Sequence, residues 1–272
     1  MRWLNEKIAG IDRRRRLPAF APKTLRELWR GTAGPVAGLL FVDTFTNHYH
    51  PEIGLAAGRV LAAAGAALAP APNVCCGRTF ISQGLLAEAR ALAEKNVERL
   101  RGASGPLIFC EPSCLSAVRE DAPALLRGEL QKEARALAGR AVLFEEFLEN
   151  HLRSGGRLDL RAGPAEILLH GHCHQKSMGL LAPAKALLAR VPGAKVTDLD
   201  AGCCGMAGSF GYRKSNYEVS RAIAERKLLP AARSMRPESV LAASGMSCRH
   251  QVRDFAEVEA LHPAVVLERL LA

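Results

Sequence analysis

The sequence predicts an α/β protein built from two duplicated, Rossmann-like modules with mostly parallel sheets. Short apolar segments alternate with amphipathic helical segments along the chain. The triplet Cys-Cys-Gly occurs twice, at Cys75–Gly77 and at Cys203–Gly205. The order of elements is the same around both triplets: strand, helix, strand, triplet, helix, strand and a further cysteine. The alternation is typical of βαβ units, and the shared order indicates internal duplication.

A lead-in segment, residues 1–35, precedes the two modules. Its proline and glycine residues predict an irregular chain, apart from a short helix at Thr24–Arg30 with Thr24 as the N-cap. We interpret this segment as a linker from a missing partner or domain, and a frayed terminal arm is the alternative. The first module is expected at residues 36–160 and the second at residues 161–272.

The first module begins with a largely apolar strand that follows Gly34 and Pro35, as expected for a buried strand of a parallel sheet. Apolar residues then recur at helical spacing in the next segment, which indicates an amphipathic helix. The expected strands are Val36–Phe45, Ala67–Ala71, Pro106–Cys110 and Ala141–Phe144, and the expected helices are Pro51–Gly65, Gln83–Arg101 and Ala122–Ala138.

The second module repeats this order. The expected strands are Glu166–His170, Lys195–Leu199 and Ser239–Ala243, and the expected helices are Lys176–Arg190 and Tyr217–Leu229. In both modules the cysteines lie at or just after strand ends. Because the carboxyl ends of parallel strands line the ligand crevice, we expect the cysteines of each half to converge at one edge of its sheet. We also expect the modules to face each other across a cleft lined by cysteines.

With 49% hydrophobic and 24% charged residues, the chain has the composition of a globular protein. The formal net charge is +10, but the arginines are mostly dispersed, Arg13–Arg16 is the one dense basic run, and no nucleic-acid motif is visible. We therefore expect no nucleic-acid partner. The start resembles no secretory signal, and no apolar run is long enough for a transmembrane segment. We expect a cytoplasmic protein, and peripheral attachment at the cytoplasmic membrane is left open.

Eight cysteines in a reducing compartment indicate metal ligands or redox thiols rather than disulfides. The first set is Cys75, Cys76, Cys110 and Cys114, and the second set is Cys173, Cys203, Cys204 and Cys248. Four thiolates fill a tetrahedral zinc site or hold an iron–sulfur cluster. Gly77 and Gly205 permit a close backbone turn around such a centre, where loop amides can donate hydrogen bonds to cluster sulfur. Packing of the cysteines as small buried hydrophobic residues is the alternative.

Polar residues beside the cysteines are candidate contacts to a cofactor. His172 and His174 flank Cys173. In an extended chain both would point away from the thiolate, so a role beside it, as hydrogen-bond donors or proton carriers, requires a turn. Arg249 and His250 follow the last cysteine and could hold the negative charge of a cluster or of an acidic substrate. A position at the surface is the alternative for each of these residues.

Five segments of the chain are similar to the tandem cysteine-rich (CCG) domains. These segments are Cys75–Gly77, Cys110–Cys114, His170–Lys176, Cys203–Gly208 and Ser247–Gln251. Such domains occur in the cysteine-rich subunit of heterodisulfide reductase, in iron–sulfur subunits of anaerobic glycerol-3-phosphate dehydrogenase and of glycolate and lactate oxidases, and in the carboxyl-terminal part of fused FAD-linked oxidases of the D-lactate dehydrogenase type. The resemblance covers nearly the whole chain. Within the lead-in, Arg2–Lys7 and Gly10–Arg14 resemble the linker that follows the ferredoxin-like domain of those oxidases.

The resemblance implies that each module binds an iron–sulfur cluster of the 4Fe-4S type, non-cubane as in heterodisulfide reductase, or acts as a redox thiol site. The family has a cysteine where this chain has Thr44, a C-x2-C ending where it has Cys110–Cys114, and a cysteine where it has Gly245. Neither module therefore carries the full five-cysteine set. Candidate substitute ligands are Asp43, His48 and His50. For the two histidines, a surface loop is the alternative.

We therefore expect an iron–sulfur-binding electron-transfer component of a flavin-dependent 2-hydroxyacid oxidoreductase, with a D-lactate-like or glycolate-like substrate. By resemblance, the FAD lies on a partner or on a domain outside this sequence. The expected partners are a flavoprotein dehydrogenase subunit or domain, a ferredoxin-like iron–sulfur protein, and a quinone or thiol electron acceptor. No residue is assigned a catalytic role.

Two alternatives are left open. One is a structural zinc-binding module that docks the flavoprotein, which the incomplete cysteine sets favour. The other is a thiol/disulfide reductase subunit of the heterodisulfide type, in which Cys203 and Cys204 would form the reactive pair.

Overall fold

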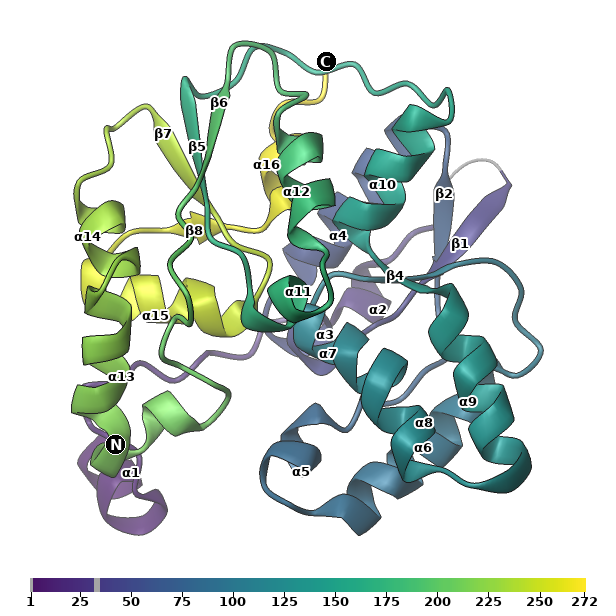
Figure 1. The fold of residues 1–272 in the computed structure, drawn as a ribbon, viewed down its shortest axis with the longest axis horizontal. Coiled ribbons are helices and arrows are strands. Elements are labelled where there is room, and N and C mark those ends of the chain that lie inside the picture. Colours follow the sequence, from purple (N-terminus) through teal and green to yellow (C-terminus); the bar gives the residue numbers. More distant parts are fainter. Residues whose placement is uncertain (1, 32–34) are drawn as a thin grey trace.

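The fold contains two four-stranded sheets in which every paired strand runs parallel, which confirms the predicted α/β class (Figure 1). The computed structural model describes residues 2–31 and 35–272. The first sheet has the order β2-β1-β3-β4, with β1 (Val36–Leu40), β2 (Ala67–Pro70), β3 (Leu107–Phe109) and β4 (Ala141–Leu143). The second has the order β6-β5-β7-β8, with β5 (Glu166–Leu169), β6 (Lys195–Asp198), β7 (Ser239–Ala242) and β8 (Ala260–Leu261). Strand for strand the two orders are the same, as duplication requires.

Helices connect the strands because parallel neighbours need crossover connections. In the first module they are α3 (Thr44–His48), α4 (Pro51–Ala63), α5 (Arg78–Ser82), α6 (Leu86–Leu100), α7 (Pro112–Ser116), α8 (Ala122–Leu125), α9 (Gly128–Arg140) and α10 (Phe144–Arg153), with a π-helical turn at Ala117–Asp121. In the second they are α11 (Cys173–Ser177), α12 (Leu181–Leu188), α13 (Tyr217–Glu225), α14 (Leu228–Arg233), α15 (Met246–Ala256) and α16 (Pro263–Glu268). Short 3₁₀ turns at Phe210–Tyr212 and Lys214–Asn216 precede α13.

Several element boundaries differ from the predicted ones. The helix predicted at Lys176–Arg190 is interrupted at Gly179, whose φ of 71° is left-handed, and the chain forms α11 and α12 instead. The helices predicted at Ala122–Ala138 and Tyr217–Leu229 are each divided in two. The predicted first strand ends at Leu40 because the chain turns into α3. The elements that were not predicted include α10, α15, β8 and α16.

The two modules share one hydrophobic core. Leu40 and Ile108 of the first sheet belong to the same cluster of buried side chains as Ile167 and Leu169 of the second. Between the sheets, α4 and α10 of the first module pack against α16 and α12 of the second (Figure 1). Burying one large aliphatic side chain stabilises a fold by about 1.5–3 kcal/mol. The shared core therefore holds the two sheet edges in fixed relative positions.

The first part of the lead-in, residues 2–16, is anchored on the second module, whereas Arg26 donates to the Ala71 carbonyl oxygen of the first, and the lead-in is not wholly irregular as predicted. It begins with helix α1 (Arg2–Ala9), which lies near α13 (Figure 1). The Arg15 side chain is fully buried. It donates hydrogen bonds to the Gly211 carbonyl oxygen at 2.7 Å and to Ser220 Oγ at 2.8 Å. The one dense basic run of the sequence is therefore partly a structural anchor.

Thr24 is the N-cap of helix α2 (Leu25–Leu28), as predicted. Its hydroxyl accepts a hydrogen bond from the Glu27 amide, and the Glu27 carboxylate accepts one from the Thr24 amide at 2.7 Å. This reciprocal pair is a capping box, although the helix is shorter than the predicted Thr24–Arg30. Within the described ranges, no helix is long and apolar enough to cross a membrane.

Candidate metal centre

In each module, the chain that leaves the first strand turns into a helix whose first residue faces the candidate site. After β1 it reaches the N-cap Asp43, and α3 begins at Thr44. After β5 it reaches the N-cap His172, and α11 begins at Cys173. Asp43 Oδ1 accepts hydrogen bonds from two α3 amides, and His172 Nδ1 accepts one from the His174 amide at 3.2 Å. Thr44 therefore has the position in the first module that Cys173 has in the second.

The third strand of each sheet leads to a second helix N-terminus. The N-cap is Glu111 before α7 and Gly245 before α15. The third residue of each helix is a cysteine, Cys114 in α7 and Cys248 in α15. Glu111 and Gly245 thus stand at equivalent positions, three residues before a cysteine. These are the places of the first cysteine in the C-x2-C ending, and neither carries a thiol.

Both Cys-Cys-Gly triplets turn sharply at the glycine. The φ angle is 84° at Gly77 and 85° at Gly205, in the left-handed region that glycine adopts without strain. A Cβ atom at Gly205 would lie 2.2 Å from the Ser220 carbonyl oxygen, so only glycine fits there. The Gly205 amide donates to Cys203 Sγ at 3.3 Å. Loop amides of the second triplet therefore do reach a candidate ligand sulfur.

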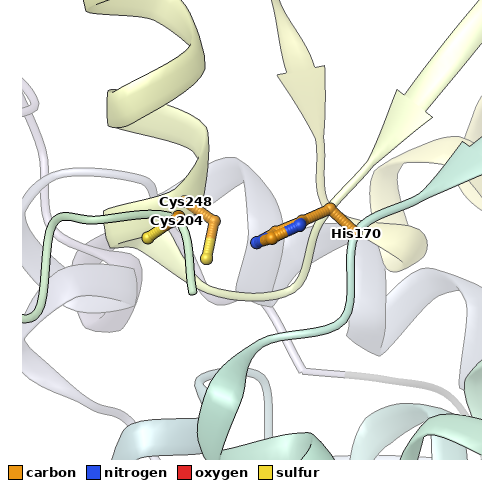
Figure 2. Close-up of side chains that lie close together, drawn as sticks. All are labelled: His170, Cys204 and Cys248. Carbon is orange, nitrogen blue, oxygen red and sulfur yellow. The ribbon is translucent and has the colours of Figure 1, made fainter. Parts of the chain in front are cut away.

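The second module brings His170, Cys204 and Cys248 together (Figure 2). Their candidate ligand atoms all lie within 4.8 Å of one another, and all three residues are buried. Cys173 and Cys203 are exposed, and Cys203 forms a side-chain hydrogen bond with Cys204 of this group. Burial, followed by the neighbouring charge of Cys203, raises the pKa of the Cys173 thiol. Four thiols and one imidazole suit a zinc ion or an iron–sulfur cluster.

The charge states at this site are set by burial and by contacts between thiols. A hydrogen bond with Cys204, together with burial, raises the pKa of Cys203 far above its ordinary value. Burial lowers the pKa of His170 to about 4, and the positive charge of Lys176 adds to this shift. His170 is therefore a neutral imidazole at pH 7, with a lone pair available to a metal. A bound cation would stabilise the thiolates and so offset the proton affinity of the cysteines.

His170 shows directly that the second site fits a metal or a cluster. Its side chain is 1% exposed, and neither Nδ1 nor Nε2 has a hydrogen-bond partner in the described part of the chain. Buried polar atoms are nearly always paired, so two unpaired nitrogens beside two thiols fit the binding of a metal or cluster. The sequence reasoning assigned His170 no role. The local signal was a histidine directly after an apolar strand and three residues before a cysteine.

The first module brings three of its four predicted ligands together. Cys76 Sγ lies 3.0 Å from Cys114 Sγ. The Cys75 thiol forms hydrogen bonds with the side chains of Cys76 and Thr44. The hydrogen bond with Cys76, together with burial, raises the pKa of Cys75 far above its ordinary value. The first site thus holds three thiols and one hydroxyl, and the hydroxyl occupies the place that Cys173 has in the second.

Cys110 lies apart from those three thiols. Side chains alternate along a strand, so Phe109 and Cys110 leave β3 on opposite faces. Phe109 packs in the same cluster as Cys76 and Cys114, whereas Cys110 packs with Ile108 in the core shared by the two modules. Burial and the charge of Asp43 raise the pKa of Cys110 well above its ordinary value. This thiol is therefore a buried core residue and is inert toward solutes.

The three polar candidates, His172, His174 and Arg249, lie near helix N-termini, where His172 and Arg249 are buried and His174 is half-buried. His172 is buried, and burial lowers its pKa to about 3. The turn into α11 brings its Nδ1 to 3.9 Å from Cys173 Sγ, and its ring stacks on His174. Arg249 is 8% exposed and donates to the carbonyl oxygens of Ala243 and Ser244. Burial excludes the surface position that was the alternative for Arg249, and its role beside a cofactor stays a prediction.

The substitute ligands considered from the sequence have other partners. Asp43 is buried and accepts a hydrogen bond from Thr46 Oγ1 at 2.6 Å. His48 Nε2 lies 3.0 Å from Asn47 Nδ2, and His50 Nε2 lies 3.2 Å from His250 Nε2. These contacts keep Asp43 at the N-cap of α3 and direct His50 toward the second module, away from Cys75 and Cys76.

A buried polar layer joins the modules, and the sequence reasoning missed it. Glu111 Oε2 accepts a hydrogen bond from the Met246 amide at 2.8 Å and so caps α15 of the other module. Its Oε1 lies 4.0 Å from His172 Nε2. Glu145 accepts a hydrogen bond from the Ser244 hydroxyl, and burial raises the pKa of Glu145 to about 7. For Glu111 a local signal existed, because it directly precedes a proline at the first position of a helix.

A cavity of about 360 Å³ lies where α15 and α16 meet the start of α4. Its polar lining includes Arg16, His50, Arg249, His250, Arg253 and Arg269. No cysteine lines this cavity, so it is not the cysteine-lined cleft that the sequence predicts. The candidate ligands lie instead at the two sheet edges.

Comparison with protein families agrees with this duplicated arrangement. The family model described as "CCG: Cysteine-rich domain" matches the chain twice, over residues 43–119 and 167–253. Each matched segment contains one Cys-Cys-Gly triplet and the cysteine-bearing helix that follows the third strand.

The chain is also similar to several proteins of known name. One subunit of the anaerobic glycerol-3-phosphate dehydrogenase of Escherichia coli (strain K12) is 30% identical over 284 residues, which cover 100% of this chain and 70% of the relative. D-2-hydroxyglutarate dehydrogenase of the same strain is 27% identical over 238 residues, 86% of this chain and 22% of the relative. Lactate utilization protein A of Oceanobacillus iheyensis is 27% identical over 201 residues, 69% of this chain and 77% of the relative.

Proposed function

Because the chain belongs to the cysteine-rich CCG domain family, we propose that it is an iron–sulfur-binding electron-transfer component of a flavin-dependent 2-hydroxyacid oxidoreductase. Two similar proteins are named as a dehydrogenase subunit and as a dehydrogenase of D-2-hydroxyglutarate, which is itself a 2-hydroxyacid. The matched region is only 22% of the latter. This supports a role as one component of a larger oxidoreductase. We propose that this component works in the cytoplasm.

The convergence of Cys204, Cys248 and an unpaired His170 at one sheet edge carries this proposal. The exposed Cys173 and Cys203 would complete a four-thiolate set around the same point. Two buried ligands and two exposed ligands would leave the centre covered by protein on one side and open to a partner on the other. An electron-transfer centre needs this arrangement, because it must be protected and yet approached closely.

A bound iron–sulfur cluster would supply one-electron transfer between a flavin, which takes two electrons from the substrate, and a further acceptor. The residues of this chain have supporting tasks. Cys248 lies in the first turn of α15, where the positive end of the helix dipole stabilises a thiolate. The Gly205 amide donates to Cys203 Sγ, which would tune the potential. The buried face formed by Cys204 and Cys248 excludes water.

The partners follow from this role. We propose that a flavoprotein dehydrogenase subunit or domain carries the FAD and delivers electrons to this chain. A ferredoxin-like iron–sulfur protein would extend the relay, and a quinone or a thiol would be the final acceptor. The exposed Cys173 and Cys203 mark the side of the second module that such a partner would approach.

We propose a weaker centre at Cys75, Cys76 and Cys114 of the first module. Three thiols converge there, and Thr44 supplies a hydroxyl where the second module supplies a thiol. Cys110 is not included, because its side chain lies in the shared core. The 3.0 Å approach of Cys76 Sγ to Cys114 Sγ favours one alternative for this module, a redox dithiol that closes to a disulfide. A zinc site is the other alternative for the chain. It applies to the second module, because a mixed set of cysteine and histidine ligands also suits zinc.

Anaerobic purification with metal analysis and an absorbance spectrum tests the function. Iron with acid-labile sulfide and a broad visible band is the expected result. Zinc alone, in a colourless protein, would sink the electron-transfer proposal and leave a docking module. A protein without bound metal, in which thiol titration shows two fewer thiols after oxidation, would favour the dithiol alternative.

A further inference from the structure

We propose that His170 supplies a nitrogen ligand to the centre of the second module, together with Cys204 and Cys248, so that cysteine and histidine share this centre. The inference rests on the proposed function, because it assigns a ligand to the same site. It goes beyond the cysteine sets read from the sequence, in which every ligand is a thiolate.

The backbone at His170 is fixed by the sheet. The residue follows β5 directly, and β5 lies between β6 and β7. The His170 amide donates to the Ala242 carbonyl oxygen at 2.9 Å. Its side chain therefore leaves the sheet edge in a set direction, and Figure 2 shows the ring pointing toward the sulfurs of Cys204 and Cys248. The 4.8 Å limit on the distances between these atoms leaves room for one metal atom among them.

Other buried histidines of the chain show what an ordinary core histidine looks like here. His262 is 1% exposed, and its Nε2 lies 2.9 Å from the Cys110 carbonyl oxygen. Its Nδ1 accepts a hydrogen bond from the Ala264 amide at 3.0 Å. His172 likewise caps α11. His170 is equally buried, yet both of its ring nitrogens are without a partner among the described residues, so packing alone does not account for it.

The first module shows that the fold does not require a polar residue at this place. Phe41 is the equivalent residue, because it directly follows β1 and its amide donates to the Ile108 carbonyl oxygen at 2.8 Å. Its ring stacks on Phe109 with centroids 4.5 Å apart. In the second module the residue after β7 is the small, buried Ala243, so no aromatic stack fills the site. At the position of His170, a histidine makes no aromatic stack of the kind that Phe41 makes, but it offers a nitrogen lone pair. Such a lone pair is useful only to a ligand-binding site.

Histidine ligation has an electronic consequence. An imidazole is neutral, whereas a thiolate is negative, so exchanging a thiolate for an imidazole makes a centre easier to reduce. His170→Cys should therefore lower the reduction potential of the centre relative to the natural protein. His170→Phe copies Phe41 and removes the ligand altogether. Even the loss of an outer hydrogen-bond partner of a metal ligand costs about 10–100-fold in affinity, so we expect at least about tenfold weaker metal retention in this variant.

The deciding experiment uses the full chain, purified anaerobically after growth with ¹⁵N-histidine, and measures nitrogen couplings by pulsed electron paramagnetic resonance of the reduced centre. We expect a histidine nitrogen coupling in the natural protein that is lost in His170→Phe and His170→Cys. His174→Gln is the matched control, because His174 flanks Cys173 and should leave the coupling unchanged. A natural protein without such a coupling, or a coupling that survives in His170→Cys, would overturn the assignment.

Two further readouts separate this inference from the proposed function. If His170→Phe fails to fold, judged by circular dichroism, His170→Cys still decides, because it retains a ligand atom. If the purified protein contains zinc and no iron, the proposed electron-transfer function fails, and replacement of zinc by Co²⁺ allows the same nitrogen coupling to be sought. A coupling lost on His170→Cys in the Co²⁺ protein supports the ligand assignment independently of the function.

Discussion

The two modules have the same strand order and the same helix starts, yet they place different atoms at equivalent positions. Where the second module has Cys173 the first has Thr44, and where the second has His170 the first has Phe41. The fold therefore tolerates both a complete donor set and a partly apolar one. The same backbone folds without these donors, which supports the proposal that the donor set of the second module serves a ligand.

The largest expected effect compares one cysteine from each module. Cys204→Ser should remove most of the bound metal and visible absorbance, because Cys204 is a buried member of the more complete donor set. Cys76→Ser should remove at most the smaller remainder, since only three thiols meet in the first module. Metal analysis of both proteins checks this. Equal losses of metal in the two variants would mean that the modules are equivalent centres despite their different donor sets.

The start of the lead-in, residues 2–16, sharpens the comparison, because it is tied to the second module. Arg15→Met removes a fully buried guanidinium and leaves its hydrogen-bond partners Gly211, Ser220 and Gln251 unsatisfied, while Asp254 keeps its ion pair with Arg253. Each buried partner left without a hydrogen bond costs about 1–3 kcal/mol, so the free energy of unfolding should fall by about 3–5 kcal/mol. Arg13→Met is the control. Its half-exposed ion pair with Glu6 should contribute little to stability, because solvent screens the charges. Urea unfolding measures both changes, and equal losses would refute the anchor.

The shared core predicts that equivalent substitutions have equivalent costs. Leu40 ends β1 and Leu169 ends β5, and both are fully buried in the same cluster. Replacing either by alanine should lower the free energy of unfolding by about 2–5 kcal/mol. Because one core serves both sheets, each variant should still unfold in a single transition. Two separate transitions by circular dichroism and fluorescence would show that the modules are independent.

The smallest expected effect concerns the polar layer between the modules. Burial raises the pKa of Glu145 from 4.5 to about 7 in the folded chain, so the folded state holds this proton more tightly than the unfolded state. The free energy of unfolding should therefore fall, by up to roughly 3 kcal/mol, as the pH rises from about 4.5 to about 7. Glu145→Gln removes this dependence.

The pH dependence is measured as a difference between the natural protein and Glu145→Gln, so that other titrating groups cancel. The natural protein should lose stability relative to the variant across this pH range. Glu129→Gln, at an exposed position, serves as the control and should follow the natural protein. A constant difference between the natural protein and Glu145→Gln would show that Glu145 does not gain a proton on folding.

Much of the fold could be predicted because its signals are local. Apolar strands, amphipathic helices and the two Cys-Cys-Gly triplets are each readable within a short window, and their repeated order indicates the duplication. The misplaced boundaries have local causes as well, such as the left-handed Gly179 within a predicted helix. The unpredicted α10 begins directly after β4, and α16 begins one residue after β8, so in both cases a short strand pattern runs almost at once into a helical one.

The sequence by itself determined the fold class, the family and the cysteine-rich character of the two sheet edges, because these depend on residue type and spacing. Only the tertiary structure decided which donors meet. Cys110 lies next to a strand end, as the other cysteines do, but the alternation of side chains along the strand directs its side chain into the shared core. His170 and Cys248 are far apart in the chain, and they meet because β5 and β7 are neighbours in the sheet. Arg15 is buried for the same kind of reason, since its partners Gly211 and Ser220 come from distant segments. Spacing along a chain specifies local geometry, whereas contacts between distant segments depend on how the sheets and the core assemble.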